Sequence, residues 1–175
     1  MDNNTDRNLV VDVKNLHISF KTFKGYSKVL NGVNLQVHKR ERIAIVGETG
    51  CGKTTTVSAI AQILAKQARI DKGEIFFNGK SVLKMNAKEL KKMRENGISI
   101  IFQDPIASLN PVFTIGNQMR EVIRYSGIDG ATDKNVQTER TIAALKETSM
   151  PDPERIMESY PFQLSGGMRQ RICIA

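Results

Sequence analysis

The stretch from Gly47 to Thr54 has the residue types and spacing of a phosphate-binding loop. It reads Gly-Glu-Thr-Gly-Cys-Gly-Lys-Thr and fits the pattern G-x-x-x-x-G-K-[ST] without a mismatch. Glycines let backbone N–H groups turn inward around the phosphates of a nucleotide. In this pattern Lys53 reaches the β- and γ-phosphates, and the Thr54 hydroxyl ligates Mg²⁺. The stretch therefore predicts a site for a nucleoside triphosphate.

The segments on either side of this loop have the patterns of a strand and a helix. The apolar run 42–46 precedes the loop. Val57, Ile60, Ala61 and Leu64 follow it at the i, i+3, i+4 and i+7 spacing of one helix face. A loop between a strand and a helix places an anion at the helix N-terminus, where backbone N–H groups point outward. The flanking pattern therefore supports the phosphate site.

The composition is that of a folded globular protein. The chain has 175 residues, of which 40% are hydrophobic and 25% charged, enough for one domain with its own core and a smaller subdomain. No apolar run reaches the roughly 18 to 20 residues that span a bilayer, and the polar N-terminus is not a secretory signal. The two cysteines form no disulfide framework, which favours a reduced, cytosolic setting.

The formal net charge of +8 raises the question of a nucleic-acid partner. The basic residues are spread along the chain, apart from two small clusters at 38–42 and 88–94. Acidic residues interrupt both clusters, and no aromatic residues are interleaved with them, as a base-stacking surface requires. We therefore expect solvated surfaces and no nucleic-acid partner.

Strand patterns dominate the chain before residue 104. The expected strands cover 9–15, 16–20, 33–37, 42–46, 74–77 and 97–102. Asn31-Gly32 and Asn78-Gly79 supply turn signals, and 87–94 has the pattern of a short helix. The run 97–102 is almost continuously apolar, which is typical of a strand buried on both faces of a parallel sheet.

Helix patterns dominate after residue 103. We expect helices at about 114–125, 134–147 and 154–159. The apolar faces expected to be buried comprise Ile115, Met119, Val122 and Ile123 in the first helix, and Ile142, Ala143 and Leu145 in the second. The expected organisation is a core formed by residues 1–103 and 165–175 and a helical subdomain formed by residues 104–164.

Two further stretches accompany the phosphate-loop pattern, Phe102-Gln-Asp-Pro-x-x-Ser-Leu-Asn-Pro111 and Leu164-Ser-Gly-Gly-Met168. In this order and spacing, the three motifs resemble those of ABC transporter ATP-binding subunits, and among these the oligopeptide, dipeptide and nickel importer branch. The resemblance extends from about residue 9 to residue 175. It implies an α/β P-loop ATPase core with a small antiparallel β region, an inserted helical subdomain, and a sheet whose C-terminal part is missing.

The resemblance also assigns roles to the residues of the motifs. The expected nucleotide-binding residues are Phe20, Gly47, Glu48, Thr49, Gly50, Cys51, Gly52, Lys53, Thr54, Thr55, Ser165, Gly166 and Gly167. Lys53 and Gln103 are the expected catalytic residues, and Thr54 and Gln103 the expected Mg²⁺ ligands. The Gln103 amide is neutral and long enough to reach the metal or its water. Ser165 is a hydroxyl beside bare glycine N–H groups at a helix start, which suits a phosphate group. The resemblance implies that this phosphate is the γ-phosphate bound to a partner subunit.

The aromatic that stacks on adenine in this family is defined less sharply by the sequence. Stacking needs only a flat ring within reach of the base. Phe20 has the best spacing from the phosphate loop, with core packing as its alternative role, and Phe23 and Tyr26 are competitors. Cys51 fills a variable position of the loop, where a thiol adduct would crowd the phosphates.

The sequence departs from the family pattern at Arg40, at Phe162 and at its C-terminal end. Phe162 stands where related sequences often have histidine. Arg40 stands where a glycine commonly precedes the strand that enters the phosphate loop. The 175 residues also stop within the signature helix, before the family's aspartate that holds the metal through water and its glutamate that polarises the attacking water. We therefore expect a truncated chain.

The function implied by the resemblance is ATP binding, with ATP hydrolysis in the intact protein, in a subunit that energises an importer of peptides or nickel. The implied partners are a second ATPase subunit, identical or paralogous, two membrane permease subunits and, indirectly, an extracytoplasmic substrate-binding protein. The implied location is peripheral, at the cytoplasmic face of the cell membrane. Two alternatives stay open, namely a nucleotide-binding fragment without turnover and a soluble ABC ATPase outside transport.

Overall fold

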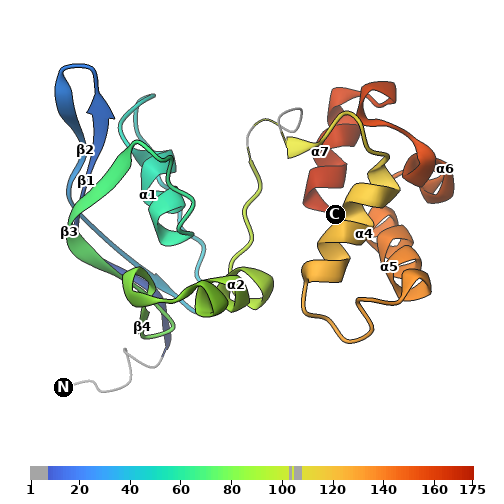
Figure 1. Cartoon of the computed structure of the whole chain (residues 1–175), viewed down its shortest axis with the longest axis horizontal. Coiled ribbons are helices and arrows are strands. Elements are labelled where there is room, and N and C mark those ends of the chain that lie inside the picture. Colours follow the sequence, from blue (N-terminus) through green and yellow to red (C-terminus); the bar gives the residue numbers. More distant parts are fainter. Residues whose placement is uncertain (1–7, 103, 105–107) are drawn as a thin grey trace. The chain divides into compact units, whose positions relative to one another are not determined.

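The computed structural model describes residues 8–102, 104 and 108–175. The chain forms two compact units, Met1–Lys91 and Lys92–Ala175. The first unit is built around strands, and the second consists of helices and loops (Figure 1). Within the described ranges, every helix is too short or too polar to cross a bilayer.

The first unit contains a four-stranded antiparallel sheet in the order β2-β1-β3-β4. Its strands are β1 (Leu9–Thr22), β2 (Gly25–His38), β3 (Ala68–Phe77) and β4 (Lys80–Ser81). Successive side chains of a strand point to opposite faces of the sheet. Val13, Leu16, Ile18, Leu30 and Ile75 are each at most 3% exposed. These residues mark the buried inner face, and the outer face is mainly polar.

Glycine and asparagine mark bulges in this sheet as well as turns. The predicted turn at Asn31-Gly32 is wrong, because the register of β1 with β2 shifts there and Gly32, with φ of 81°, is an extra residue inside β2. The chain reverses instead at Phe23-Lys24. The segments 9–15 and 16–20 form one strand, β1, with a bulge at Asn15 (φ 46°). A residue that tolerates a left-handed φ fits a bulge as well as a turn, so glycine or asparagine in the sequence does not distinguish between the two.

Three helical segments complete the first unit and lead into the second. They are α1 (Lys53–Ile60), the 3-10 turn η2 (Val82–Lys84) and α2 (Ala87–Asn96). The predicted short helix at 87–94 is confirmed by α2. Asn86 begins this helix, since its side-chain oxygen accepts the backbone N–H groups of Lys88 and Glu89, both at 3.0 Å.

Helix α1 ends earlier than its apolar spacing predicts. Gln62 adopts a left-handed φ of 55°, and the N–H groups of Gln62 and Ile63 donate to carbonyl oxygens of the last helical turn. This is a Schellman C-cap with glutamine in the position that glycine usually occupies. The predicted helix face 57–64 is therefore wrong in its second half, and in its first half Val57 is 42% exposed.

The predicted strands at 42–46 and 97–102 are also wrong. Neither segment pairs with any strand in the part of the chain that the structure describes. Their apolar side chains are largely open to solvent, with Val46 90% and Ile101 59% exposed. A central strand depends on hydrogen bonds to neighbours on both sides. An apolar sequence indicates that a segment could be buried, but it does not show that neighbouring strands are present to pair with it.

The second unit is a helical cluster. Its elements are α4 (Ile115–Tyr125), α5 (Lys134–Glu147), α6 (Pro153–Glu158), the 3-10 turn η3 (Pro161–Gln163) and α7 (Gly166–Ile174). The predicted helices at 114–125, 134–147 and 154–159 are confirmed within a residue or two. Thr114 and Asp133 cap α4 and α5 by accepting backbone N–H groups, at 3.3 Å from Asn117 and 2.7 Å from Asn135.

One apolar core joins these helices. Its buried members are Ile115, Leu145, Met150, Ile156, Met157, Leu164 and Ile172. Two residues predicted to be buried are not, since Val122 is 72% exposed and Ala143 is also exposed. Ile172 places α7 in this core, together with the helices that precede it. The boundaries at 104 and 165 remain a prediction about the longer family fold.

Candidate nucleotide-binding site

The phosphate-loop residues form an exposed loop that leads directly into α1. Gly50 and Gly52 have φ of 84° and 98°. L-residues with a Cβ rarely adopt such angles, so the backbone conformation favours glycine at both positions. Glu48 and Thr49 are exposed, and Gly52 is the first buried residue of the loop. The loop is therefore open to solvent and anchored at its end.

The Lys53 side chain folds back into the loop. Its ammonium Nζ donates to the carbonyl oxygens of Gly47 at 2.7 Å and Glu48 at 2.6 Å. The Cys51 N–H also donates to the Glu48 carbonyl, at 3.3 Å. The loop thus encircles a positive charge, which is the arrangement that a phosphate group would require.

The first turn of α1 lies next to this charge. The Thr56 N–H and hydroxyl both bond the Gly52 carbonyl, at 2.9 and 3.0 Å. Backbone N–H groups ahead of the first intrahelical bond have no partner within the helix, and they carry the positive end of the helix dipole. Thr54 is exposed and Thr55 half-buried in this turn. Thr54 is therefore open to solvent in the first turn of α1.

Cys51 packs closely inside the loop. A Cβ added at Gly47 would lie 2.7 Å from the Cys51 Sγ, so glycine at 47 makes room for this thiol. The Cys51 side chain is exposed, and its Sγ lies 3.7 Å from the Lys53 Nζ. An adduct on Cys51 would therefore enter the space that the loop surrounds.

The sheet register separates the three aromatic candidates. Phe20 pairs with Ser27 and lies two residues from Ile18, which puts it on the inner face. Tyr26 pairs with Lys21, the next residue along β1, and so lies on the outer face. Phe23 is fully exposed in the hairpin turn.

The phosphate loop approaches the inner face of the sheet. The nearest atom to a Cβ added at Gly52 would be Cδ2 of Leu30, and Leu30 pairs with Ile18 on that face. The Tyr26 ring is instead covered by the Arg69 guanidinium, whose carbon lies 4.1 Å from the ring centre. Of the three aromatics, Phe20 alone shares a face with the end of the loop.

The turn that precedes the phosphate loop is held by a carboxylate. Glu41 accepts the backbone N–H of His38 at 2.6 Å, and its oxygen lies 3.1 Å from the His38 Nδ1. These contacts, chiefly the backbone hydrogen bond, hold the pKa of Glu41 below its usual value. Arg40 adopts a left-handed φ of 64° in this turn, a conformation that favours glycine, which is the residue that the family resemblance led us to expect there.

The second candidate phosphate site lies in the helical unit. Ser165 is the N-cap of α7, and its hydroxyl accepts the Met168 N–H at 3.3 Å. Gly166 and Gly167 are exposed and have no atom within 4 Å of the positions where a Cβ would stand. The space beside both glycines at the start of α7 is therefore open, and a role for this segment at a phosphate group stays a prediction.

Residues 30–175 match the family model described as ABC transporter. This match covers most of the chain and both candidate phosphate sites. The chain belongs to the ABC transporter family.

Curated members of the family that resemble the chain are named as peptide transport proteins. The probable peptide ABC transporter ATP-binding protein y4tR of Sinorhizobium fredii is 38% identical over 176 residues, which cover 100% of this chain and 52% of that protein. The dipeptide transport ATP-binding protein DppD of Bacillus subtilis is 39% identical over 168 residues, covering 95% of this chain and 49% of that protein. The chain spans about half the length of these relatives.

Solved ABC cassettes share the fold. The dimeric ATP-binding cassette MJ0796 bound to ADP and Pi superposes with a TM-score of 0.79 at 26% identity, covering 94% of this chain and 67% of that chain. CbiO1 from Clostridium perfringens, part of the ABC transporter complex cbiONQ, gives a TM-score of 0.68 at 25% identity, covering 95% and 60%. The predicted α/β ABC ATPase fold is confirmed by these neighbours.

One predicted site residue cannot be placed. Gln103, the expected catalytic amide and metal ligand of this ABC chain, lies outside the described residues. Phe102, immediately before it, is 57% exposed. The role of Gln103 therefore remains a prediction from the family motif.

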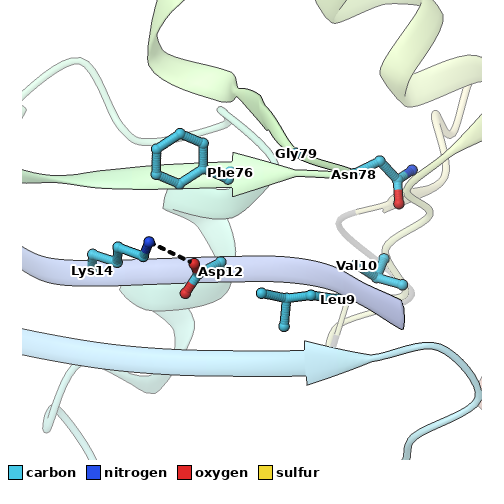
Figure 2. A pocket seen from close by; sticks show the side chains of 7 residues that line it. All are labelled: Leu9, Val10, Asp12, Lys14, Phe76, Asn78 and Gly79. Atoms are coloured by element: carbon cyan, nitrogen blue, oxygen red, sulfur yellow. Dashed lines mark ion pairs between the residues drawn. The ribbon is translucent and has the colours of Figure 1, made fainter. Parts of the chain in front are cut away.

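A hollow of about 470 Å³ opens elsewhere on the sheet of the ABC chain. Figure 2 shows the side chains that line it, among them Asp12, Lys14 and Phe76. The Lys14 ammonium lies 3.1 Å from the Asp12 carboxylate and 5.3 Å from the Phe76 ring centre. Alternation along β1 and β3 puts these side chains on the outer face. None of the predicted nucleotide-binding residues lines this hollow.

Proposed function

We propose that this chain is the ATP-binding part of an ABC importer subunit for peptides. The observation that carries the proposal is the closed phosphate loop, in which the Lys53 ammonium at the start of α1 bonds the carbonyl oxygens of Gly47 and Glu48. Membership of the ABC family supports ATP as the nucleotide. The names of the relatives support peptides as the cargo, and nickel remains a prediction from the sequence.

Each residue of the loop has a proposed task. Backbone N–H groups from Gly50 to Thr55 would donate to the phosphate oxygens, and Lys53 would exchange its carbonyl acceptors for the β- and γ-phosphates. Mg²⁺, held by the Thr54 hydroxyl and the Gln103 amide, would neutralise phosphate charge. Phe20 would stack on adenine from the inner face. Hydrolysis in the intact protein would then proceed by in-line attack of water on the γ-phosphate.

The bare start of α7 suggests that each ATP site is shared between two subunits. Ser165, Gly166 and Gly167 would close over the γ-phosphate bound to a second ATPase subunit, identical or paralogous. The solved relative MJ0796 is dimeric, which supports this arrangement. Two permease subunits and, through them, a substrate-binding protein would complete the importer. The ATPase would then sit peripherally at the cytoplasmic face of the membrane.

For residues 1–175 taken alone, we propose nucleotide binding without turnover. The family's water-polarising glutamate has no counterpart in this stretch, so charge stabilisation by Lys53 would act on bound ATP without an activated nucleophile. Mg²⁺-dependent hydrolysis by the purified chain, abolished by Lys53→Ala, would contradict this part of the proposal.

The binding proposal is tested by calorimetric titration with ATP. The wild-type chain should bind with a measurable Kd, and Lys53→Ala should weaken binding at least about 10-fold, because it removes a charge-assisted contact worth roughly 1.5–3 kcal/mol. Lys80→Ala, at an exposed lysine of β4, is the matched control and should bind like the wild type. Equal Kd values for all three proteins would refute the assignment of the site.

A further inference from the structure

The end of the phosphate loop rests directly on strand β2. A Cβ added at Gly52 would lie 2.5 Å from Cδ2 of Leu30 and 3.4 Å from the Val29 carbonyl oxygen. The space beside Gly52 is therefore already filled by β2. Both the φ of 98° and this contact restrict position 52 to glycine.

Strand β2 is irregular at the point of contact. Ile18 of β1 pairs with Leu30, but Ser19 pairs with Lys28, so Val29 is an extra residue in β2. A bulge of this kind bends its strand and redirects the adjoining side chains and carbonyls. Here the bulged residue and its neighbour are the two residues that meet Gly52.

The contact is buried on the strand side and hydrogen-bonded on the loop side. Leu30 is 3% exposed, and its pairing partner Ile18 is fully buried within the sheet. On the loop side, the Gly52 carbonyl accepts both the N–H and the hydroxyl of Thr56, a buried residue of α1. Residues 41–51, by contrast, are exposed. Gly52 is thus the point at which an otherwise open loop is fixed to the sheet.

We propose that Leu30 is a positioning residue for nucleotide binding, which acts by packing behind Gly52. This inference rests on the proposed function, since it concerns the same phosphate loop. The Leu30 side chain touches no phosphate. It sets where the loop turns into α1, and so the direction of the N–H groups from Gly50 to Thr54. A shorter side chain at position 30 leaves space into which Gly52 can move. The N–H groups then no longer point toward the same phosphate position.

The test compares ATP affinity with stability in matched variants. Leu30→Ala should weaken ATP binding about 10-fold, and Leu30→Met, which refills the space, should restore it to within about twofold of the wild type. Ile75→Ala is the control, because Ile75 is equally buried on the inner face but lies on β3, separated from β2 by β1. It should lower the urea midpoint of unfolding as Leu30→Ala does, while leaving the Kd for ATP within twofold.

Three results would overturn the inference: wild-type affinity in folded Leu30→Ala, an equal loss of affinity in Ile75→Ala, or no recovery in Leu30→Met. If Leu30→Ala does not fold, Leu30→Val decides, with a lower affinity than Leu30→Met supporting the inference and an equal affinity overturning it. Failure of the wild-type chain to bind ATP would instead refute the proposed function, so the two failures are distinguishable.

Discussion

The Lys53 ammonium lies 2.7 Å from the carbonyl oxygen of Gly47, six residues earlier in the chain. This hydrogen bond closes the phosphate loop into a ring with Lys53 at its centre, and the Glu48 carbonyl adds a second bond at 2.6 Å. Charge-assisted hydrogen bonds of this kind are short and strong. An incoming phosphate group would offer the ammonium a charged acceptor in place of two neutral ones, so binding and loop geometry are directly coupled.

Substitution at Gly52 should be far more damaging than substitution at an open glycine. Gly52→Ala combines a left-handed φ with a Cβ 2.5 Å from Leu30, and should lower the free energy of unfolding by about 2–4 kcal/mol. Gly50→Ala has the unfavourable φ but no neighbour within 4 Å, and should cost about 1–2 kcal/mol. Urea unfolding measures both.

Gly166→Ala is the control for these two variants, since nothing lies within 4 Å of its Cβ position and it begins α7. It should change the free energy of unfolding by less than about 1 kcal/mol and in the stabilising direction, because alanine is the better helix former. A Gly52→Ala protein as stable as Gly166→Ala would show that the loop is not fixed to β2.

The two cysteines should differ in their reactivity toward alkylating reagents. Cys51 is exposed, whereas Cys173 is partly buried and burial raises the pKa of its thiol, which lowers the thiolate fraction at neutral pH. Iodoacetamide should therefore modify Cys51 first, as read by peptide mass spectrometry. Prior addition of ATP should slow the reaction at Cys51 and leave Cys173 unchanged.

The modified protein should also bind ATP more weakly, because the adduct occupies the space around Lys53. Cys51→Ser should bind ATP like the wild type and keep its affinity after the same treatment. Full ATP affinity after complete alkylation of Cys51 would show that this thiol does not face the nucleotide.

Replacing Arg40 by glycine should stabilise the chain. Arg40 holds a left-handed φ of 64°, which costs a residue with a Cβ about 1–2 kcal/mol. Glycine removes this cost, but part of the gain in stability is lost because glycine has more conformational freedom in the unfolded chain. The expected increase in unfolding free energy is about 0.5–1 kcal/mol. Lys39→Gly, at the adjacent exposed residue that has no positive φ, should destabilise. The opposite order of the two variants would contradict this account of the turn.

The Glu41 carboxylate should make the turn before the loop sensitive to acid. Its pKa is lowered from 4.5 in the folded chain by the hydrogen bond from the His38 N–H, so the folded state binds its proton less readily than the unfolded state. The stabilisation is therefore complete above pH 4.5 and is lost as the pH falls through the lower folded value. Glu41→Gln should be less stable than the wild type at pH 7, and the difference should shrink toward pH 3. A stability difference between the wild type and Glu41→Gln that does not change with pH would show that the ionised Glu41 carboxylate does not stabilise the turn.

The sequence predicts local features well where local physics determines them. The phosphate loop is recognisable because Gly50 and Gly52 meet a backbone requirement that no other residue meets as easily. The helix at 134–147 is recognisable because Asp133 caps it and its apolar residues repeat. In each case the cause lies within a few residues of the effect.

Features that depend on distant partners were predicted poorly. The strands expected at 42–46 and 97–102 need neighbouring strands, which an apolar pattern does not provide. Gly32 fits a bulge as well as a turn, and only the register with β1 decides between them. The contact of Leu30 with Gly52 joins residues 22 positions apart through the Val29 bulge, which leaves no periodic signal in the sequence. Alternation along β2 could have indicated that Leu30 is buried, but not what it touches.

Amide hydrogen exchange with and without MgATP decides whether the phosphate loop binds the nucleotide, because it locates the ligand on the chain. We expect slower exchange for the N–H groups of residues 50–55 on addition of MgATP, loss of this protection in Lys53→Ala, and unchanged exchange at residues 9–14 and 76–79 beside the outer-face hollow. Protection centred on the hollow, or none at residues 50–55 under saturating MgATP, would contradict the claim that this loop is the nucleotide site.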